Sequence, residues 1–265
     1  MRLAPLVAGA LAPALAAAAS AHTPYLVPGN FAPRAGETVA LDAAFAETFF
    51  VPEAAFDKSR FAVTGPDGGE TAPDTVQVLK TRTVAEHTLP KAPGTYRFST
   101  GPRYGALFRT WEIDGKRESS RDPAVAIPAD AKVLSNFQSL TLAETYVTIG
   151  EPDRGALRPR GKGIELVPVT HPNDLYAGET FEFVVQYDGE PLADQKVEIA
   201  EAVWTSDRKP QETTLLTDAQ GRAGFRLERA GTWLALTRHR TPAPADAPVD
   251  EYSNSYTLAF RALEP

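Results

Sequence analysis

The sequence contains no cysteine, and this absence excludes several kinds of structure at once. Without thiols the fold has no disulfide, no lipid-modified cysteine and no cysteine nucleophile, and a bound metal ion must be held by nitrogen and oxygen ligands. The chain of 265 residues must therefore obtain its stability from its hydrophobic core.

Common enzyme motifs are also missing. The sequence has no Gly-x-Ser-x-Gly element, no His-Glu-x-x-His element and no glycine-rich phosphate loop. We therefore expect no enzymatic activity. One catalytic alternative stays open, a copper-dependent oxidase built on an N-terminal histidine, which is the geometry of some secreted polysaccharide oxygenases.

Basic residues are too few for a nucleic-acid partner. The 27 lysines and arginines are outnumbered by 34 acidic residues, for a formal net charge of −7. A protein that binds nucleic acid needs a basic face, so we expect no such partner. The acidic balance suits a cationic ligand, although it is also ordinary for a soluble protein.

Long apolar runs are absent except at the N-terminus. Arg2 precedes an apolar run at residues 3–18, and the small residues Ala19-Ser20-Ala21 follow it. This order is typical of a secretory signal peptide, and the run is shorter than the ~20 strongly apolar residues of a membrane anchor. We expect residues 1–21 to be removed during export, which makes the mature protein periplasmic and His22 its first residue.

The remaining sequence alternates apolar and polar residues in short segments that end at turns, which predicts strands with one buried face. With 23 prolines, helices are limited to short candidates at residues 52–58 and 140–145. We expect an all-β fold of two Ig-like or transthyretin-like β-sandwich domains joined by an irregular connector. The expected ranges are 22–115 for the N-terminal sandwich, 116–162 for the connector and 163–265 for the C-terminal sandwich.

A short internal echo supports a duplication. Arg34-Ala-Gly-Glu-Thr-Val in the first half is similar to Tyr176-Ala-Gly-Glu-Thr-Phe in the second half. Both segments place a glycine turn directly before a predicted strand. We therefore expect the two sandwiches to begin in similar ways.

Six blocks of sequence span most of the mature chain: Ala21-His-Thr-Pro-Tyr-Leu-Val-Pro, Gly163-Ile-Glu-Leu-Val-Pro, Leu175-Tyr-Ala-Gly-Glu, Asp188-Gly-Glu-Pro-Leu, Thr217-Asp-Ala-Gln-Gly-Arg-Ala and Ala230-Gly-Thr-Trp-Leu. In their order and spacing these blocks resemble the DUF4198 family of secreted bacterial proteins. Those proteins are often described as periplasmic components of cobalt or nickel uptake, so the resemblance implies a metal-ion ligand and a membrane metal transporter or TonB-dependent receptor as partner.

His22 is the first candidate metal ligand. An N-terminal histidine offers its free amine and its imidazole Nδ1 to one ion, and a second imidazole completes a set that suits copper or nickel. The family resemblance favours this role, because its members tend to begin near this histidine. The alternative is that His22 is simply the frayed end of an exported chain.

The other candidate ligands are His239, His171 and His87. His239 follows the Gly-x-Trp-Leu element, as the family resemblance implies, but Arg238 and Arg240 flank it and oppose a cation. His171 lies in a turn where capping is the alternative role, and His87 lies at a hairpin edge where it could simply face solvent. No spacing between these histidines forces them together.

The sequence therefore predicts a periplasmic protein that binds a divalent transition-metal ion, copper, nickel or cobalt. Copper would bind nitrogen ligands most tightly, so the physiological ion depends on supply. The alternative is an Ig-like interaction module that presents loops or a sheet edge to an outer-membrane receptor or a transporter and binds no metal.

Overall fold

The computed structural model describes residues 22–202 and 210–265, and all regular elements of this part are strands. The all-β prediction is therefore confirmed. No helix among the described residues is long and apolar enough to cross a membrane. The predicted signal peptide at residues 1–21 lies outside the described residues. The short helices expected at 52–58 and 140–145 were wrong, because the second range lies inside a long strand and the first contains a two-residue strand.

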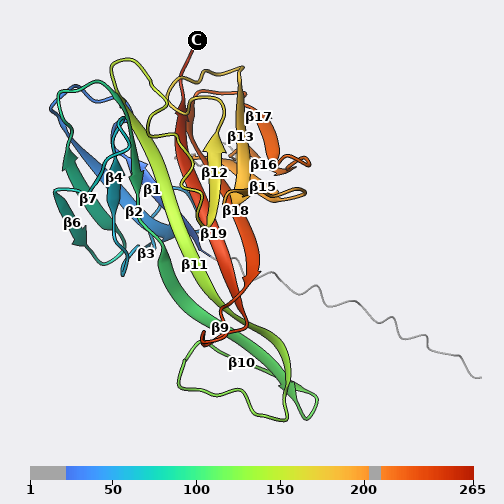
Figure 1. Ribbon diagram of the computed structural model, residues 1–265. Coiled ribbons are helices and arrows are strands. Elements are labelled where there is room, and N and C mark those ends of the chain that lie inside the picture. Colours follow the sequence, from blue (N-terminus) through green and yellow to red (C-terminus); the bar gives the residue numbers. More distant parts are fainter. Residues whose placement is uncertain (1–21, 203–209) are drawn as a thin grey trace, which may run out of the picture.

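The strands form three sheets, which we call the N-sheet, the central sheet and the C-sheet (Figure 1). The N-sheet contains β1 (Thr23–Pro28), β2 (Thr38–Ala46), β3 (Ala54–Ala55), β6 (Thr75–Val78) and β7 (Thr83–Thr88). The C-sheet contains β12 (Ile164–Pro168), β13 (Thr180–Tyr187), β14 (Glu190–Pro191) and β17 (Arg222–Arg226). The ten-stranded central sheet contains β4 (Ala62–Thr64), β5 (Glu70–Thr71), β8 (Gly94–Ser99), β9 (Arg103–Ile113), β10 (Lys116–Ser120), β11 (Lys132–Ile149), β15 (Lys196–Glu201), β16 (Glu212–Leu216), β18 (Gly231–Pro242) and β19 (Glu251–Ala262).

The central sheet runs through both halves of the chain because β11 and β19 pair in parallel, with Ala143 opposite Thr257. Successive residues of a strand point to opposite faces of its sheet. Ala143 and Val147 therefore enter a core beneath the N-sheet, while Leu142 and Tyr146 enter a core beneath the C-sheet. The N-sheet and the C-sheet thus cover opposite faces of the central sheet.

The expected irregular connector is not present. Residues 116–162 contain β10 and the 18-residue strand β11, which is a central strand of the largest sheet. The second half of β11 is buried on both faces, so its sequence lacks the alternation that marks a half-buried strand. The central sheet is continuous across the predicted domain boundaries. Two separate domains with these boundaries therefore stay a prediction.

The two halves repeat the same hairpin. Pro28 of β1 lies opposite Leu41, and Pro168 of β12 lies opposite Phe183, at matching places in the strands that follow the echoed turns. In both turns a glutamate accepts a hydrogen bond from a backbone N–H: Glu37 from Arg34 at 2.9 Å, and Glu179 from Tyr176 at 3.0 Å. The turn glycines of both copies have positive φ, 80° at Gly36 and 91° at Gly178. The echo in the sequence therefore corresponds to a structural repeat.

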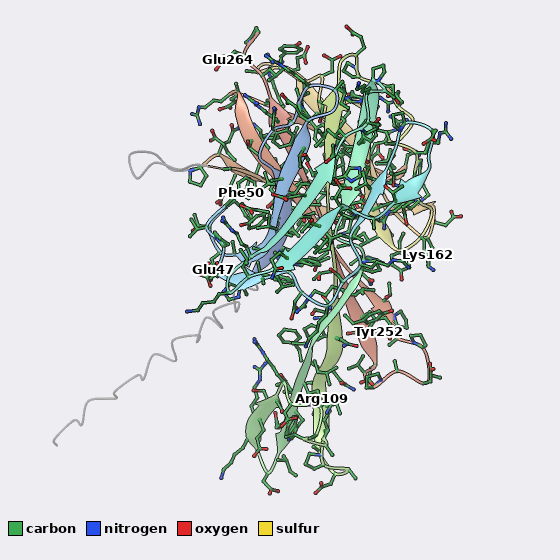
Figure 2. All side chains as sticks on the ribbon, turned by 90° about the vertical axis from the view of Figure 1, so that its left-hand side faces the viewer. Glu47, Phe50, Arg109, Lys162, Tyr252 and Glu264 are labelled. Carbon is green, nitrogen blue, oxygen red and sulfur yellow. The ribbon has the colours of Figure 1, made fainter. Side chains whose placement is uncertain are left out.

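A β arm extends beyond the sandwiches (Figure 1). We define the arm as β9, β10, the first half of β11 and the loop at residues 121–131. Arg109 marks it in Figure 2. Phe108 and Phe137 stack across its strands with ring centroids 4.8 Å apart, and Arg240 lies 3.5 Å over the Phe137 ring. Stacked aromatic and cation–π contacts of this kind stabilise the arm where it has no second sheet behind it.

Candidate metal centre

His22 is positioned by the pairing of β1 with β2. Thr23 lies opposite Ala46 in this antiparallel pair, which brings the preceding residue, His22, to the end of β2 where Glu47 follows. The imidazole Nε2 lies 2.7 Å from Glu53 Oε2 and 3.9 Å from Glu47 Oε1. Within residues 22–202 and 210–265, these three residues lie close enough together to hold a metal ion, because one potential ligand atom of each lies within 4.8 Å of the other two.

Glu53 is held in place by backbone contacts. Its own N–H donates to the Phe45 carbonyl at 3.0 Å, just before β3 pairs with β2. Its Oε1 accepts the Glu47 backbone N–H at 2.9 Å, which leaves Oε2 for His22. Below this segment, buried Phe50 packs against Tyr25 of β1 with ring centroids 4.8 Å apart. The carboxylate therefore has a fixed position relative to the start of β1.

The group is open to solvent. The side chain of His22 is 48% exposed, and those of Glu47 and Glu53 are 57% and 38% exposed. Figure 2 shows Glu47 at the surface, on the same side of the molecule as Phe50. A carboxylate that accepts a hydrogen bond from Nε2 orients the ring and makes Nδ1 a better ligand. The arrangement can thus present Nδ1 to an ion without a rearrangement of the strands.

A polar cavity of about 700 Å³ adjoins this group. Thr23, Glu47 and Phe49 form one wall, and residues of β15, β16 and β18 form the other. The second wall adds two carboxylates and two hydroxyls: Glu198, Glu212, Thr213 and Thr214. The His22 end of β1 therefore borders a space large enough for a small polar molecule or the side chains of a partner.

His171 has a structural role. Its Nδ1 accepts the Asn173 backbone N–H at 3.1 Å, so Nε2 carries the proton and donates to the Asp153 carbonyl at 2.9 Å. Burial lowers the pKa of His171. With both ring nitrogens in hydrogen bonds, the imidazole fixes the turn before β13 and has no nitrogen free for an ion.

His239 and His87 also have other neighbours. His239 Nδ1 lies 3.2 Å from Gln195 Oε1, and burial lowers the pKa of this histidine. His87 Nδ1 lies 3.4 Å from Asp74 Oδ1 on the N-sheet. Within the described part of the chain, none of these three histidines joins the group at His22.

The second and third members of the candidate group, Glu47 and Glu53, were not predicted from the sequence. The β1–β2 register would have indicated Glu47, because it places the residue after β2 next to the residue before β1. Glu53 could not be found in this way, since it reaches the group only through the return of the chain at β3. Sequence reasoning therefore located one of the three side chains.

A separate ionic cluster is buried between the two halves. Glu144 of β11 is 1% exposed and accepts a 2.7 Å hydrogen bond from the Tyr256 hydroxyl. Its Oε1 lies 3.6 Å from Arg160 Nε and 3.9 Å from Arg97 Nε. Burial opposes ionisation of Glu144, yet Arg160 and Arg97 hold its pKa below the ordinary value. This cluster joins β8, β11 and β19 and is enclosed by protein, which indicates a structural role.

A family model described as "Domain of unknown function (DUF4198)" matches residues 19–241. No curated protein matches the chain in sequence.

Several solved structures show weak similarity. Trypsin-activated alpha-2-macroglobulin from Escherichia coli has 12% identity and a TM-score of 0.25, with 91% of this chain covered but 15% of that protein. The D0-D1 domain of intimin has 13% identity and a TM-score of 0.22, with 89% and 96% covered. The Yersinia pseudotuberculosis adhesin InvE has 12% identity and a TM-score of 0.23, with 91% and 58% covered. At these TM-scores the similarities support no functional argument.

Proposed function

This chain belongs to the DUF4198 family, and we propose that it is an exported periplasmic protein that binds a divalent transition-metal ion at a mature N-terminus formed by His22. The observation that supports this most is the 2.7 Å contact between His22 Nε2 and Glu53 Oε2 at the start of β1. This contact orients the imidazole through Nε2, while a chelate formed by the α-amine of His22 would use Nδ1.

In the proposed site, cleavage after Ala21 frees the α-amine of His22. The amine and Nδ1 bind the ion as a chelate, while Glu53 accepts the Nε2 proton and orients the ring. Glu47 adds negative charge nearby, which favours a cation. No second histidine is needed, and water or a group from a partner completes the coordination.

The exposure of the group suits exchange of the ion with another protein. A half-exposed site with few protein ligands releases its ion more readily than a closed structural site. The adjacent polar cavity offers room for ligands from a membrane metal transporter or TonB-dependent receptor. We therefore propose delivery or receipt of the ion at this end of the molecule, with copper, nickel or cobalt as cargo according to supply.

Titration calorimetry with Cu(II) and Ni(II) tests this function. The protein that begins at His22 should bind one ion, and a form with an acetylated His22 α-amine should bind at least about tenfold more weakly because the acetylated nitrogen cannot chelate. His22→Ala should abolish binding, whereas His239→Ala should leave it unchanged. Equal affinity of the two N-terminal forms would contradict the chelate, and no binding by either would contradict the metal function.

The arm favours a second candidate function, that of a protein-interaction module. Several large apolar residues of the arm are exposed, among them Tyr104 at 55%, Val133 at 47% and Leu134 at 42%. A photo-crosslinking residue in place of Leu134 should then capture one envelope protein, while the same residue in place of Glu190 should not. If neither position gives a product, the interaction module loses its support.

A further inference from the structure

A second cavity lies in the first half of the molecule, and its lining includes none of the three residues of the candidate metal group. It has a volume of about 570 Å³, and we call it the His87 cavity. Its walls are mostly apolar and rich in proline, and its polar rim includes two carboxylates. The lining residues that matter here are Pro66, Asp67, Glu70, His87, Pro90, Ala92, Pro93 and Tyr96.

The repeat shows what is unusual about this cavity. His87 lies opposite Val39 in the N-sheet, and Phe225 lies opposite Phe181 at the matching place in the C-sheet. Phe225 is 8% exposed and packs against Trp233 with ring centroids 5.5 Å apart. The first half thus has an imidazole beside an open cavity where the second half has a phenyl ring in its core.

The surroundings of His87 determine which nitrogen can accept a hydrogen bond. Asp74 Oδ2 accepts the Thr88 backbone N–H at 2.7 Å, and this bond holds the pKa of Asp74 below its usual range. The ionised Asp74 lies 3.4 Å from the buried Nδ1 of His87, which favours a proton on that nitrogen. Nε2 is then the acceptor that the imidazole offers to a ligand.

The rim of the cavity is acidic and has no lysine or arginine among its lining residues. Asp67 is held by the β4–β5 turn, where its Oδ1 accepts the Gly69 N–H at 2.9 Å. No ion pair involves Asp67 or Glu70 among the described residues. Two carboxylates without a cationic partner, next to apolar walls, complement a positive charge on an apolar molecule.

We propose that the His87 cavity binds a small organic cation, namely a primary amine with a compact apolar body. The ammonium group lies at the acidic rim formed by Asp67 and Glu70, and the His87 imidazole offers Nε2 as an acceptor on the wall of the same cavity. The apolar body packs against the ring of Tyr96, whose hydroxyl is already bonded to the Ala92 carbonyl at 3.1 Å, and against the prolines. This site is independent of the proposed metal function.

Phenethylamine is a suitable probe, with phenylacetate and 2-phenylethanol as matched controls of negative and zero charge. In a titration followed by amide NMR shifts of the full chain, phenethylamine should bind saturably and move the signals of residues 63–71 and 87–96. Phenylacetate should not bind, and the alcohol should bind at least about fivefold more weakly, which is the effect of one ion pair in water.

Two variants distinguish this site from non-specific association. Ala92→Trp fills the cavity from an exposed position and should abolish binding, while Glu70→Gln should weaken it about fivefold. Glu190→Gln removes an exposed carboxylate from β14, on the C-sheet, and should have no effect. Equal binding of phenylacetate, unchanged binding by Ala92→Trp, or no saturable shifts would each overturn the proposal.

Discussion

The two halves of the molecule use the same hairpin for different purposes. Counting back along each first strand from the common Leu-Val-Pro, His22 in the first half corresponds to Lys162 in the second half. Glu47, counted forward from the echoed Ala-Gly-Glu-Thr turn, corresponds to Gly189. At the corresponding end of the hairpin in the second half, the Gly163 N–H donates a hydrogen bond of 2.7 Å to Asp188 Oδ1. The repeat therefore provides a scaffold, and the side chains that differ between its copies include those of both proposed binding sites in the first half.

The same comparison between the two halves applies to the His87 cavity. The pair Phe225 and Trp233 fills the core of the second half, while the matching pair His87 and Tyr96 lines a cavity in the first. A residue that is apolar in one copy and polar in the other has lost packing energy at that place. Such positions are candidates for function, and exchanging them between the halves tests the comparison.

The largest expected difference between the halves is in core stability. Trp233→Ala should cost about 4 kcal/mol of unfolding free energy, because the indole is fully enclosed. Tyr96→Ala removes the matching ring, which borders the cavity, and should cost about 2 kcal/mol. Urea denaturation followed by circular dichroism measures both values, and equal losses would show that the cavity does not loosen the first half.

Removal of the buried charge between the halves should have the next largest effect. Glu144→Gln leaves Arg97 without its anion and Arg160 with Glu165 alone, and should cost about 3 kcal/mol at pH 7. Glu251→Gln breaks a surface pair with Arg240 and is the control, with an expected loss below about 1 kcal/mol.

The pH dependence of the same variant has a definite sign. Because the pKa of Glu144 is lowered on folding, the carboxylate contributes stability above its unfolded pKa of about 4.3 and loses that contribution as the pH falls through the folded value. The cost of Glu144→Gln should therefore shrink as the pH falls below about 4. A cost that stays constant from pH 7 to pH 3 would show that folding does not lower the pKa of Glu144.

Glu53 should matter to metal binding through its hold on the imidazole. Glu53→Gln keeps the acceptor for the Glu47 N–H but loses the anionic partner of His22, and should weaken Cu(II) binding about tenfold. Lys162→Gln changes the matching end of the second half and should leave the affinity unchanged. Calorimetry on the two variants compares them directly, and a gain with Lys162→Gln as large as the loss with Glu53→Gln would point to general electrostatics.

The smallest expected effect comes from making the first half more like the second. His87→Phe introduces the residue of the other copy and should raise the unfolding free energy by about 0.5 to 1 kcal/mol through added apolar burial. It should also abolish phenethylamine binding by removing the acceptor. Destabilisation by this variant would show that the pair with Asp74 outweighs the packing.

The sequence predicted the strands that bury one face, because their side chains alternate. Of β11 it indicated only a short strand at residues 146–149, because the second half of β11 is buried on both faces and the range was expected to be an irregular connector. The hairpin echo was visible because the glycine turns at Gly36 and Gly178 require particular residues.

The candidate site was predictable only in part. His22 stands out as the residue that follows a predicted cleavage site, but its partners Glu47 and Glu53 depend on strand register and chain reversal. The expectation that other imidazoles would converge on it had no basis in spacing, and His171 instead stabilises a turn through both ring nitrogens. Tertiary contacts decide such roles, and short-range patterns do not contain them.

Electron paramagnetic resonance of one equivalent of Cu(II) tests the central claim most directly. Protein that begins at His22 should show hyperfine coupling to nitrogens of both an amine and an imidazole, and [¹⁵N]histidine labelling should alter both couplings. The form with an acetylated His22 α-amine should lose the amine coupling. Identical spectra from the two forms, or copper spectra without nitrogen coupling, would contradict a metal site created by export at His22.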